Sequence, residues 1–255
     1  MDAARARGVK VALVTGRRYP SARRVADELG GPVALVLHNG ALVVEDGRVR
    51  RCRPLALAVA QRAIRAGRAG GVSPVVHCGL AGEGRLLVER DARGSPLVSR
   101  YLEQSRPDVT IVADLLQDLV EDPIQVMFGG RGEEMEELLP ALRAATGAEA
   151  RIERTVYRRI GVGILDVLDP GVGKHAGLVF LQERWGLAAR DTLAIGDNWN
   201  DREMLERAGL GLVMGNADPG MLDLGFPVLP SNDEDGAAWG IEKHVLGGDA
   251  KKERG

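Results

Sequence analysis

The chain has 255 residues, of which 45% are hydrophobic and 27% are charged, a composition typical of a globular protein with room for one or two domains. Its formal net charge is −2, and Lys and Arg are spread along the chain, so nucleic acid is not an expected partner. Two cysteines make no disulfide framework, and no apolar run approaches the ~20 residues that cross a bilayer. We therefore expect a cytoplasmic protein that binds neither nucleic acid nor a membrane; the sequence does not indicate its oligomeric state.

Strand-like apolar runs alternate with amphipathic helical stretches near both ends of the chain. The predicted strands cover residues 9–14 and 192–195, and the predicted helices cover residues 20–29, 174–185 and 199–208. This alternation is typical of a parallel α/β sheet, which places its ligands at the carboxyl ends of the strands.

The middle of the chain has a different pattern. Its strands are short, several look paired as hairpins, and helices are predicted over residues 55–66 and 133–145. This pattern predicts an α+β domain inserted into the first one. We assign residues 1–41 and 160–247 to the α/β domain, residues 42–159 to the insertion and residues 248–255 to a polar tail.

The sharpest chemical signal is the segment Gly196-Asp197-Asn198-Trp199-Asn200-Asp201, which follows a predicted strand. A carboxylate at a strand end, with further Asn and Asp side chains within one turn, makes an oxygen-rich site suited to Mg²⁺. Taken alone, the segment fits a capped helix start equally well, because Asp and Asn are favoured there for local reasons.

Two further turns carry groups that suit a phosphate. Thr15, Gly16 and Arg17 end the first predicted strand, and a hydroxyl with backbone N–H groups at a helix start can hold phosphate oxygens. The alternative is an ordinary turn with a solvated Arg17. Lys174 opens a predicted helix, where a cation works against the helix dipole unless an anion lies between them. A lysine extended into water is the alternative there.

Together these segments resemble the haloacid dehalogenase (HAD) superfamily and, most closely, its Cof-like phosphatases. Thr15 with Gly16 matches the second motif of the superfamily, Lys174 the third, and Asp197 with Asn200 and Asp201 the fourth. The segments HNGAL and SNDEDGAAWGIEKHVL add to the similarity, so that it covers nearly the whole chain. The resemblance implies a Rossmann-like parallel sheet core, with the insertion as a cap that closes over the substrate.

The resemblance also implies a Mg²⁺-dependent phosphatase of small phosphorylated metabolites such as sugar phosphates. The expected catalytic residues are Lys174 and Asp197. The expected phosphate-binding residues are Thr15, Gly16, Lys174 and Asn200. Asp197 is the expected metal ligand, with Asp201 either beside it or supporting it from behind, and Arg17 and Asn39 are candidate substrate contacts.

Superfamily members begin with an apolar strand that ends in Asp-x-Asp-Gly-Thr. Its first Asp attacks phosphorus and its second is the general acid and base. This sequence has no such segment ahead of residues 9–14, so the resemblance implies that the central strand and the nucleophile are absent and that the chain as given is inactive. The strands at residues 11–14 and 192–195 carry no polar substitution that would adapt them to a sheet edge. This favours a start codon assigned too far downstream. A non-catalytic phosphate-binding remnant is the alternative, and a mutase or phosphotransferase is a third reading.

Two other features carry less weight. Asp233-Glu234-Asp235-Gly236 has the Asp-x-Asp-Gly spelling, but Ala237 stands where Thr is expected and polar residues separate the segment from the preceding apolar run. A polar loop is therefore expected there. The four histidines, His38, His77, His175 and His244, lack metal-ligand spacing, and we expect them to be structural or surface residues.

Overall fold

In the computed structural model, which describes residues 1–79, 84–90, 96–157 and 160–247, the strands form three sheets. A four-stranded sheet has the order β1 (Ala12–Val14), β2 (Ala34–Leu37), β3 (Leu42–Glu45), β4 (Arg48–Cys52). A two-stranded sheet pairs β11 (Leu193–Gly196) with β12 (Leu210–Val213). A six-stranded sheet has the order β7 (Val109–Val112), β6 (Leu86–Glu89), β5 (Val75–His77), β8 (Gln125–Arg131), β10 (Val162–Leu168), β9 (Arg151–Tyr157). The predicted polar tail at residues 248–255 lies outside the described residues.

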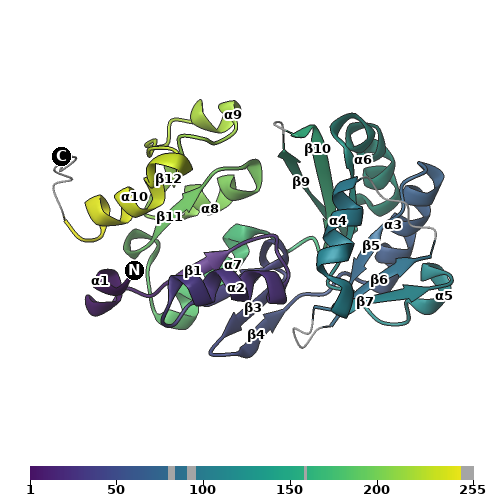
Figure 1. Cartoon of the computed structure of the whole chain (residues 1–255), viewed down its shortest axis with the longest axis horizontal. Coiled ribbons are helices and arrows are strands. Elements are labelled where there is room, and N and C mark those ends of the chain that lie inside the picture. Colours follow the sequence, from purple (N-terminus) through teal and green to yellow (C-terminus); the bar gives the residue numbers. More distant parts are fainter. Residues whose placement is uncertain (80–83, 91–95, 158–159, 248–255) are drawn as a thin grey trace.

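Figure 1 shows the first two sheets in one half of the molecule and the six-stranded sheet in the other. We call them the α/β half and the six-stranded half. The helices of the α/β half are α1 (Asp2–Ala6), α2 (Tyr19–Leu29), α7 (Lys174–Trp185), α8 (Arg202–Arg207), α9 (Pro219–Leu222) and α10 (Gly236–His244). Those of the six-stranded half are α3 (Leu57–Ala69), α4 (Pro96–Gln104), α5 (Leu115–Asp118) and α6 (Gly132–Thr146). No helix among these described residues is long and apolar enough to cross a membrane.

The α/β half has the predicted alternation of strand and helix. Strand β1 pairs parallel with β2, and β11 pairs parallel with β12. The predicted helix at residues 174–185 is observed with the same bounds as α7, which ends at Gly186 in the left-handed conformation that favours glycine at a helix C-terminus. Helix α7 lies close against β2: a Cβ atom added to Gly177 would lie 2.3 Å from the Val36 side chain. The α/β prediction is therefore confirmed, although the sheets are mixed.

Sheet membership differs from the predicted domain boundaries at both ends of the insertion. Strand β3 pairs antiparallel with β2, and β4 continues the same sheet, so residues 42–52 belong to the α/β half. Strand β10 pairs with β8 and β9 in the six-stranded sheet, although residues from 160 onward were assigned to the other domain. The difference has a physical cause: an alternating hairpin pattern indicates pairing but does not say which sheet the hairpin extends.

Strands β1 and β11 each have a single partner among the described residues. Strand β1 is hydrogen-bonded to β2 alone and β11 to β12 alone. All three residues of β1 are only half-buried, whereas all four residues of β2 are buried. An apolar strand is thus partly uncovered next to the β11–β12 pair.

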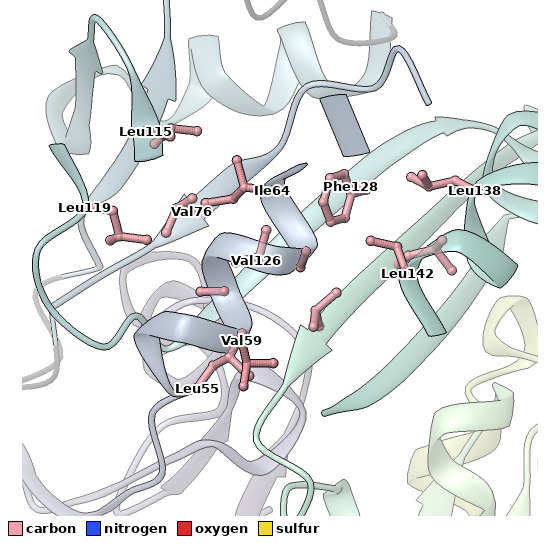
Figure 2. Packing of buried hydrophobic residues seen from close by; sticks show 14 of the residues in the cluster. Leu55, Val59, Ile64, Val76, Leu115, Leu119, Val126, Phe128, Leu138 and Leu142 are labelled. Atoms are coloured by element: carbon pink, nitrogen blue, oxygen red, sulfur yellow. The ribbon is translucent and has the colours of Figure 1, made fainter. Parts of the chain in front are cut away.

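Alternate side chains of β8 serve two separate cores in the six-stranded half. Val126 and Phe128 pack with α3 and α6 in the larger cluster, where Ile64 and Leu142 are also fully buried (Figure 2). Met127 points to the other side and packs with residues of α4 such as Val98. The sheet is therefore covered on both faces, and α4 lies on the face opposite α3 and α6.

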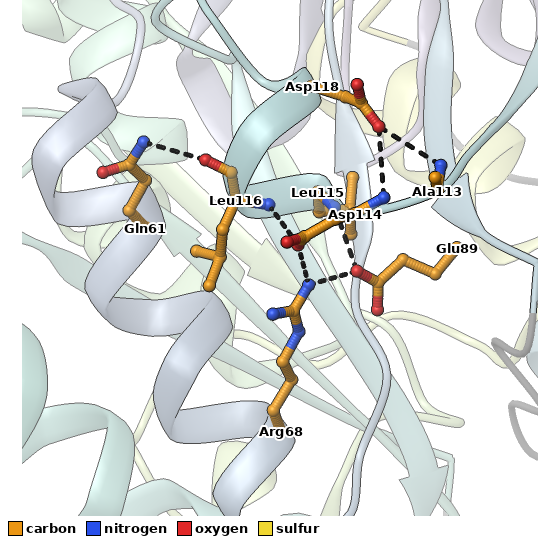
Figure 3. Close-up of polar contacts among 8 residues, drawn as sticks. All are labelled: Gln61, Arg68, Glu89, Ala113, Asp114, Leu115, Leu116 and Asp118. Atoms are coloured by element: carbon orange, nitrogen blue, oxygen red, sulfur yellow. Dashed lines mark hydrogen bonds and ion pairs between the residues drawn. The ribbon is translucent and has the colours of Figure 1, made fainter.

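Arg68 of α3 ties several elements of this half together (Figure 3). Its guanidinium donates to the carboxylates of Glu89 and Asp114. Asp114 in turn caps α5 by accepting the backbone N–H of Leu116 at 2.9 Å, while Glu89 accepts that of Leu115 at the same distance. One cation thus fixes the start of α5 against β6 and α3.

Both cysteines, Cys52 and Cys78, are free thiols.

Candidate functional site

A cavity of about 590 Å³ is lined by residues of both halves, a size suited to a small molecule. From the α/β half it is lined by Thr15, Gly16, Arg17, Arg18, Ser21, Lys174, Asp197, Asn198 and Asn200. From the six-stranded half it is lined by His77, Val98, Tyr101, Gln104, Gln125, Met127, Gly129, Thr155, Tyr157, Ile160, Ile164 and Asp166. The first set includes most of the residues predicted to bind phosphate and metal, and these come from turns at the carboxyl ends of β1 and β11 and from the start of α7.

A second hollow of about 410 Å³ lies beside the β9 strand and α8. Its charged lining residues neutralise one another, since Arg151 pairs with Glu203 and Arg202 pairs with Glu206. The described cations of this hollow are therefore paired with carboxylates and do not favour an anionic ligand.

Lys174 is the buried cation of the cavity. Its ammonium nitrogen donates to Oδ1 of Asp201 at 2.7 Å and to Oδ1 of Asn200 at 3.0 Å, and the residue is 8% exposed. It stands at the N-terminus of α7, where the free backbone N–H groups add to its positive charge. Lys174 and these N–H groups are hydrogen-bond donors for an anionic ligand, although Asp201 pairs with Lys174 and the Asp197 carboxyl lies nearby.

The loop after β11 is held in shape by Asp201. The second oxygen of Asp201 accepts the backbone N–H groups of Asp197, at 3.2 Å, and of Asn198, at 3.1 Å. Both oxygens of Asp201 are thus engaged. Asp197 lines the cavity. Partial desolvation and the neighbouring charge of Asp201 raise the pKa of the Asp197 carboxyl, whereas the charge of Lys174 acts to lower it.

The donor set fits Mg²⁺ held mainly by one carboxylate. Mg²⁺ in phosphoryl-transfer sites keeps several waters and takes one or two carboxylates together with substrate phosphate oxygens. Asp197 can serve as such a ligand. Asp201 holds it in position by accepting hydrogen bonds from the backbone N–H of Asp197 and from Lys174. Among the described residues no group of three or more His, Cys, Asp or Glu side chains could hold a metal.

Asn39, a predicted substrate contact, is not among the residues that line the cavity. It is 1% exposed and has the positive φ of 55° that Asn tolerates. Its side-chain nitrogen donates to Oδ2 of Asp166 and its oxygen accepts from the side-chain nitrogen of Asn200, both at 3.1 Å. Asn39 thus links Asp166 to Asn200 through its side-chain amide, and its role as a substrate contact stays a prediction. Arg17, the other candidate contact, does line the cavity and is exposed.

The sequence analysis missed the residues that the six-stranded half contributes. Asp166 interrupts the apolar run ILDVL of β10, and a carboxylate inside a buried strand is a signal that could have pointed to it. His77 was expected to be a structural or surface residue; it is buried and stacks on Tyr101, and it also lines the cavity. Burial lowers the pKa of His77 well below its usual value, so the imidazole is neutral at pH 7.

Arg18 was also missed, and it connects the two halves. It is 5% exposed, and its guanidinium donates to the carbonyl oxygen of Gly84 at 3.0 Å and to the carboxylate of Asp108. Nothing in the sequence around residue 18 indicates these distant partners. By contrast, the expected polar loop at Asp233–Gly236 is a short 3₁₀ turn leading into α10, and it does not line the cavity.

Comparison with known proteins shows the family of the chain. A family model described as haloacid dehalogenase-like hydrolase matches residues 1–241. The chain belongs to this family. It is 27% identical over 251 residues to the stress response protein YhaX of Bacillus subtilis, covering 93% of this chain and 82% of that protein.

Shorter matches connect the chain to phosphatases of the family. It is 31% identical over 129 residues to the 5-amino-6-(5-phospho-D-ribitylamino)uracil phosphatase YitU of Bacillus subtilis, covering 50% of this chain and 46% of that enzyme. It is 50% identical over 66 residues to the HMP-PP phosphatase of Cronobacter sakazakii, covering 26% of this chain and 24% of the enzyme. The chain thus matches less than half of each of these two enzymes.

Solved structures share the fold. A haloacid dehalogenase-like hydrolase from B. subtilis superimposes with a TM-score of 0.78 at 20% identity, covering 95% of this chain and 90% of that one. The HAD subclass IIB sugar phosphatase BT4131 superimposes with a TM-score of 0.75 at 20% identity, covering 95% of this chain and 88% of that one. The fold of the chain is therefore that of the haloacid dehalogenase-like hydrolases.

Proposed function

We propose that the chain forms the phosphate and metal site of a cytoplasmic, Mg²⁺-dependent phosphatase that hydrolyses monoesters of small metabolites, sugar phosphates among them. The observation that supports this most directly is the gathering of Thr15, Gly16, Lys174, Asp197 and Asn200 at one end of a single cavity. The activities named for the uracil, HMP-PP and sugar phosphatases, which the chain resembles in part of its sequence or in fold, agree with a small phosphorylated substrate.

Phosphoryl transfer depends mainly on neutralising charge around the phosphate. Lys174 is suited to this, because its buried ammonium already binds oxygen ligands at 2.7 and 3.0 Å. Thr15 supplies a hydroxyl and Gly16 a backbone N–H at the end of β1, whereas the N–H of Thr15 donates to Val36. Asn200 is held beside Lys174 by Asn39. A Mg²⁺ ion bound by Asp197 would add positive charge and orient the phosphate.

The proposal includes a carboxylate nucleophile that forms an aspartyl-phosphate, which water then hydrolyses. We place that carboxylate on a strand between β1 and β11, outside the residues of this chain. The support is that β1 and β11 each pair on one side only among the described residues, and that their carboxyl ends both reach the cavity. In the same proposal, the six-stranded half acts as the cap that covers the substrate.

Hydrolysis of p-nitrophenyl phosphate with Mg²⁺ tests the proposal. It should be measured for the chain as given and for a form extended by the residues encoded upstream of Met1, each with Asp197→Asn and with Asp223→Asn as an exposed acidic control. We expect turnover only in the extended form, its loss in Asp197→Asn and its retention in Asp223→Asn. If neither form turns over while inorganic phosphate still binds, the second candidate, a catalytically inactive phosphate-ligand-binding protein of the same fold, is favoured.

A further inference from the structure

The end of the cavity formed by the six-stranded half has its own polar group, Asp166. This residue of β10 is 6% exposed and lines the cavity. Its Oδ1 accepts the side-chain N–H of Gln125 at 2.9 Å, and its Oδ2 accepts that of Asn39 at 3.1 Å. Both partners are neutral amides. Within the described part of the chain no Lys, Arg or His forms an ion pair with Asp166.

A buried carboxylate without a cationic partner is costly, because neutral amides return only part of the lost hydration. Desolvation accordingly raises the pKa of Asp166 to about 7, while the hydrogen bond from Asn39 opposes the rise. A carboxylate offers about four lone-pair positions, and the two amides use two of them. Asp166 can therefore accept further hydrogen bonds from a ligand in the cavity, and a donor there would reduce the cost of its burial.

His77, a second polar group at this end, can also form further hydrogen bonds. Neither ring nitrogen of His77 has a hydrogen-bond partner among the described residues, and the side chain is 3% exposed and lines the cavity. A neutral imidazole has one donor and one acceptor nitrogen. Its ring lies between His38, edge to face at 5.2 Å, and Tyr101, stacked at 6.1 Å, so its orientation is fixed.

The charges at this end disfavour a second anion. Arg18 is the buried cation nearest to Tyr101 and His77, but its guanidinium is already engaged by Asp108 and the carbonyl of Gly84. His77 is neutral, and Asp166 becomes negative above its pKa. The remaining lining residues from the six-stranded half are uncharged, and the α/β half contributes Arg17 as an exposed cation. A ligand with a second phosphate or a carboxylate would meet repulsion from Asp166.

A line of hydrogen bonds joins this end to the phosphate end. Asp166 is bonded to Asn39, Asn39 to Asn200, and Asn200 to Lys174, at 3.1, 3.1 and 3.0 Å. These contacts fix the position of the Asp166 carboxylate relative to the Lys174 ammonium. A ligand that occupies both must carry its phosphate and its donor group at a matching separation.

We propose that Asp166 is a specificity-determining residue, which accepts a hydrogen bond from an amino or hydroxyl group on the non-phosphate part of a phosphate monoester. The inference rests on the proposed function, because it takes Lys174 as the phosphate anchor. It narrows the substrate class to monoesters whose alcohol part is neutral or cationic and carries an N–H or O–H donor across from the phosphate.

The test compares three cyclohexyl phosphates that differ at ring position 4 in trans: amino, hydroxyl and methyl. Their dissociation constants for the full chain are measured by isothermal titration calorimetry at pH 8 without added Mg²⁺, in wild type, Asp166→Asn and Asp169→Asn. Asp169 is the matched control, because it lies three residues further along the chain, pairs with Arg53 and does not line the cavity. The methyl ester serves as the internal reference, so a general disturbance of the fold cancels in the affinity ratio.

We expect wild type and Asp169→Asn to bind the amino and hydroxyl esters about tenfold more tightly than the methyl ester, as is typical of hydrogen bonds to charged groups. In Asp166→Asn this preference should fall to about twofold or less. Equal affinities for the three esters in wild type, or an unchanged preference in Asp166→Asn, would overturn the inference. Inorganic phosphate separates the two proposals: if it binds and no ester does, only the inference fails, and if neither binds, both fail.

Discussion

Asp166 gives the chain a pH dependence that a single substitution should remove. Burial raises the pKa of this carboxyl from 3.8 to about 7. Between these values the folded state keeps the proton that the unfolded state releases, so the free energy of unfolding falls as the pH rises from about 4 to 7 and is level above. At roughly 1.4 kcal/mol per pKa unit, the loss is about 4 kcal/mol in full and about 3 kcal/mol between pH 5 and pH 8.

The variant Asp166→Asn lacks this titration. Its stability relative to wild type should therefore improve by about 3 kcal/mol from pH 5 to pH 8, whatever fixed cost arises from the changed bonds to Asn39 and Gln125. Urea denaturation followed by circular dichroism at the two pH values measures this difference, and the buried His38 and His77 cancel because both proteins contain them. As a control, Ile164→Val removes one methylene from the same strand and should differ from wild type equally at both pH values. A pH-independent difference for Asp166→Asn would show that its carboxyl is not desolvated as described.

Three further predictions concern the phosphate end and the core. Lys174→Met leaves Asp201 as a buried carboxylate without its ammonium partner; unfolding should become about 3 kcal/mol easier by urea denaturation, and binding of inorganic phosphate should be lost by calorimetry. In Gly40→Ala the new Cβ atom would lie 2.2 Å from the carbonyl oxygen of Gly173, at a φ of +108° that disfavours alanine. We expect the free energy of unfolding, measured by urea denaturation, to fall by about 2 kcal/mol or more. Phosphate binding should weaken by calorimetry, because Gly173 precedes Lys174. Phe128→Ala empties a fully buried position of the six-stranded half; thermal unfolding should reveal a loss of about 3–5 kcal/mol, while phosphate affinity at 25 °C stays unchanged.

The residues of the proposed phosphate site could be named from the sequence because each lies at the end of a strand-like run or at the start of a helix-like one. Thr15 and Asp197 follow apolar runs that read as strands, and Lys174 opens a helix whose bounds were predicted correctly. Parallel strands of one α/β half place their carboxyl ends on the same side, so these residues could be expected to meet before any contact was known. Asp201 illustrates the limit of such reasoning: its position in the motif suggested a role at the metal, but the use of both its oxygens by Lys174 and the loop amides depends on the folded geometry.

The tertiary structure alone decided the other end of the cavity. Strand β3 pairs with β2, its neighbour in the chain, whereas β10 pairs with the more distant β8. The alternation of apolar residues does not encode which of these pairings forms. Likewise, Asp166 looks like a single polar interruption of a strand until Asn39 and Gln125 are brought to it from 127 and 41 residues away. The sequence by itself therefore determined the chemistry that local motifs carry. The packing of the two halves determined which other side chains line the cavity, because such contacts form only between surfaces that folding brings together.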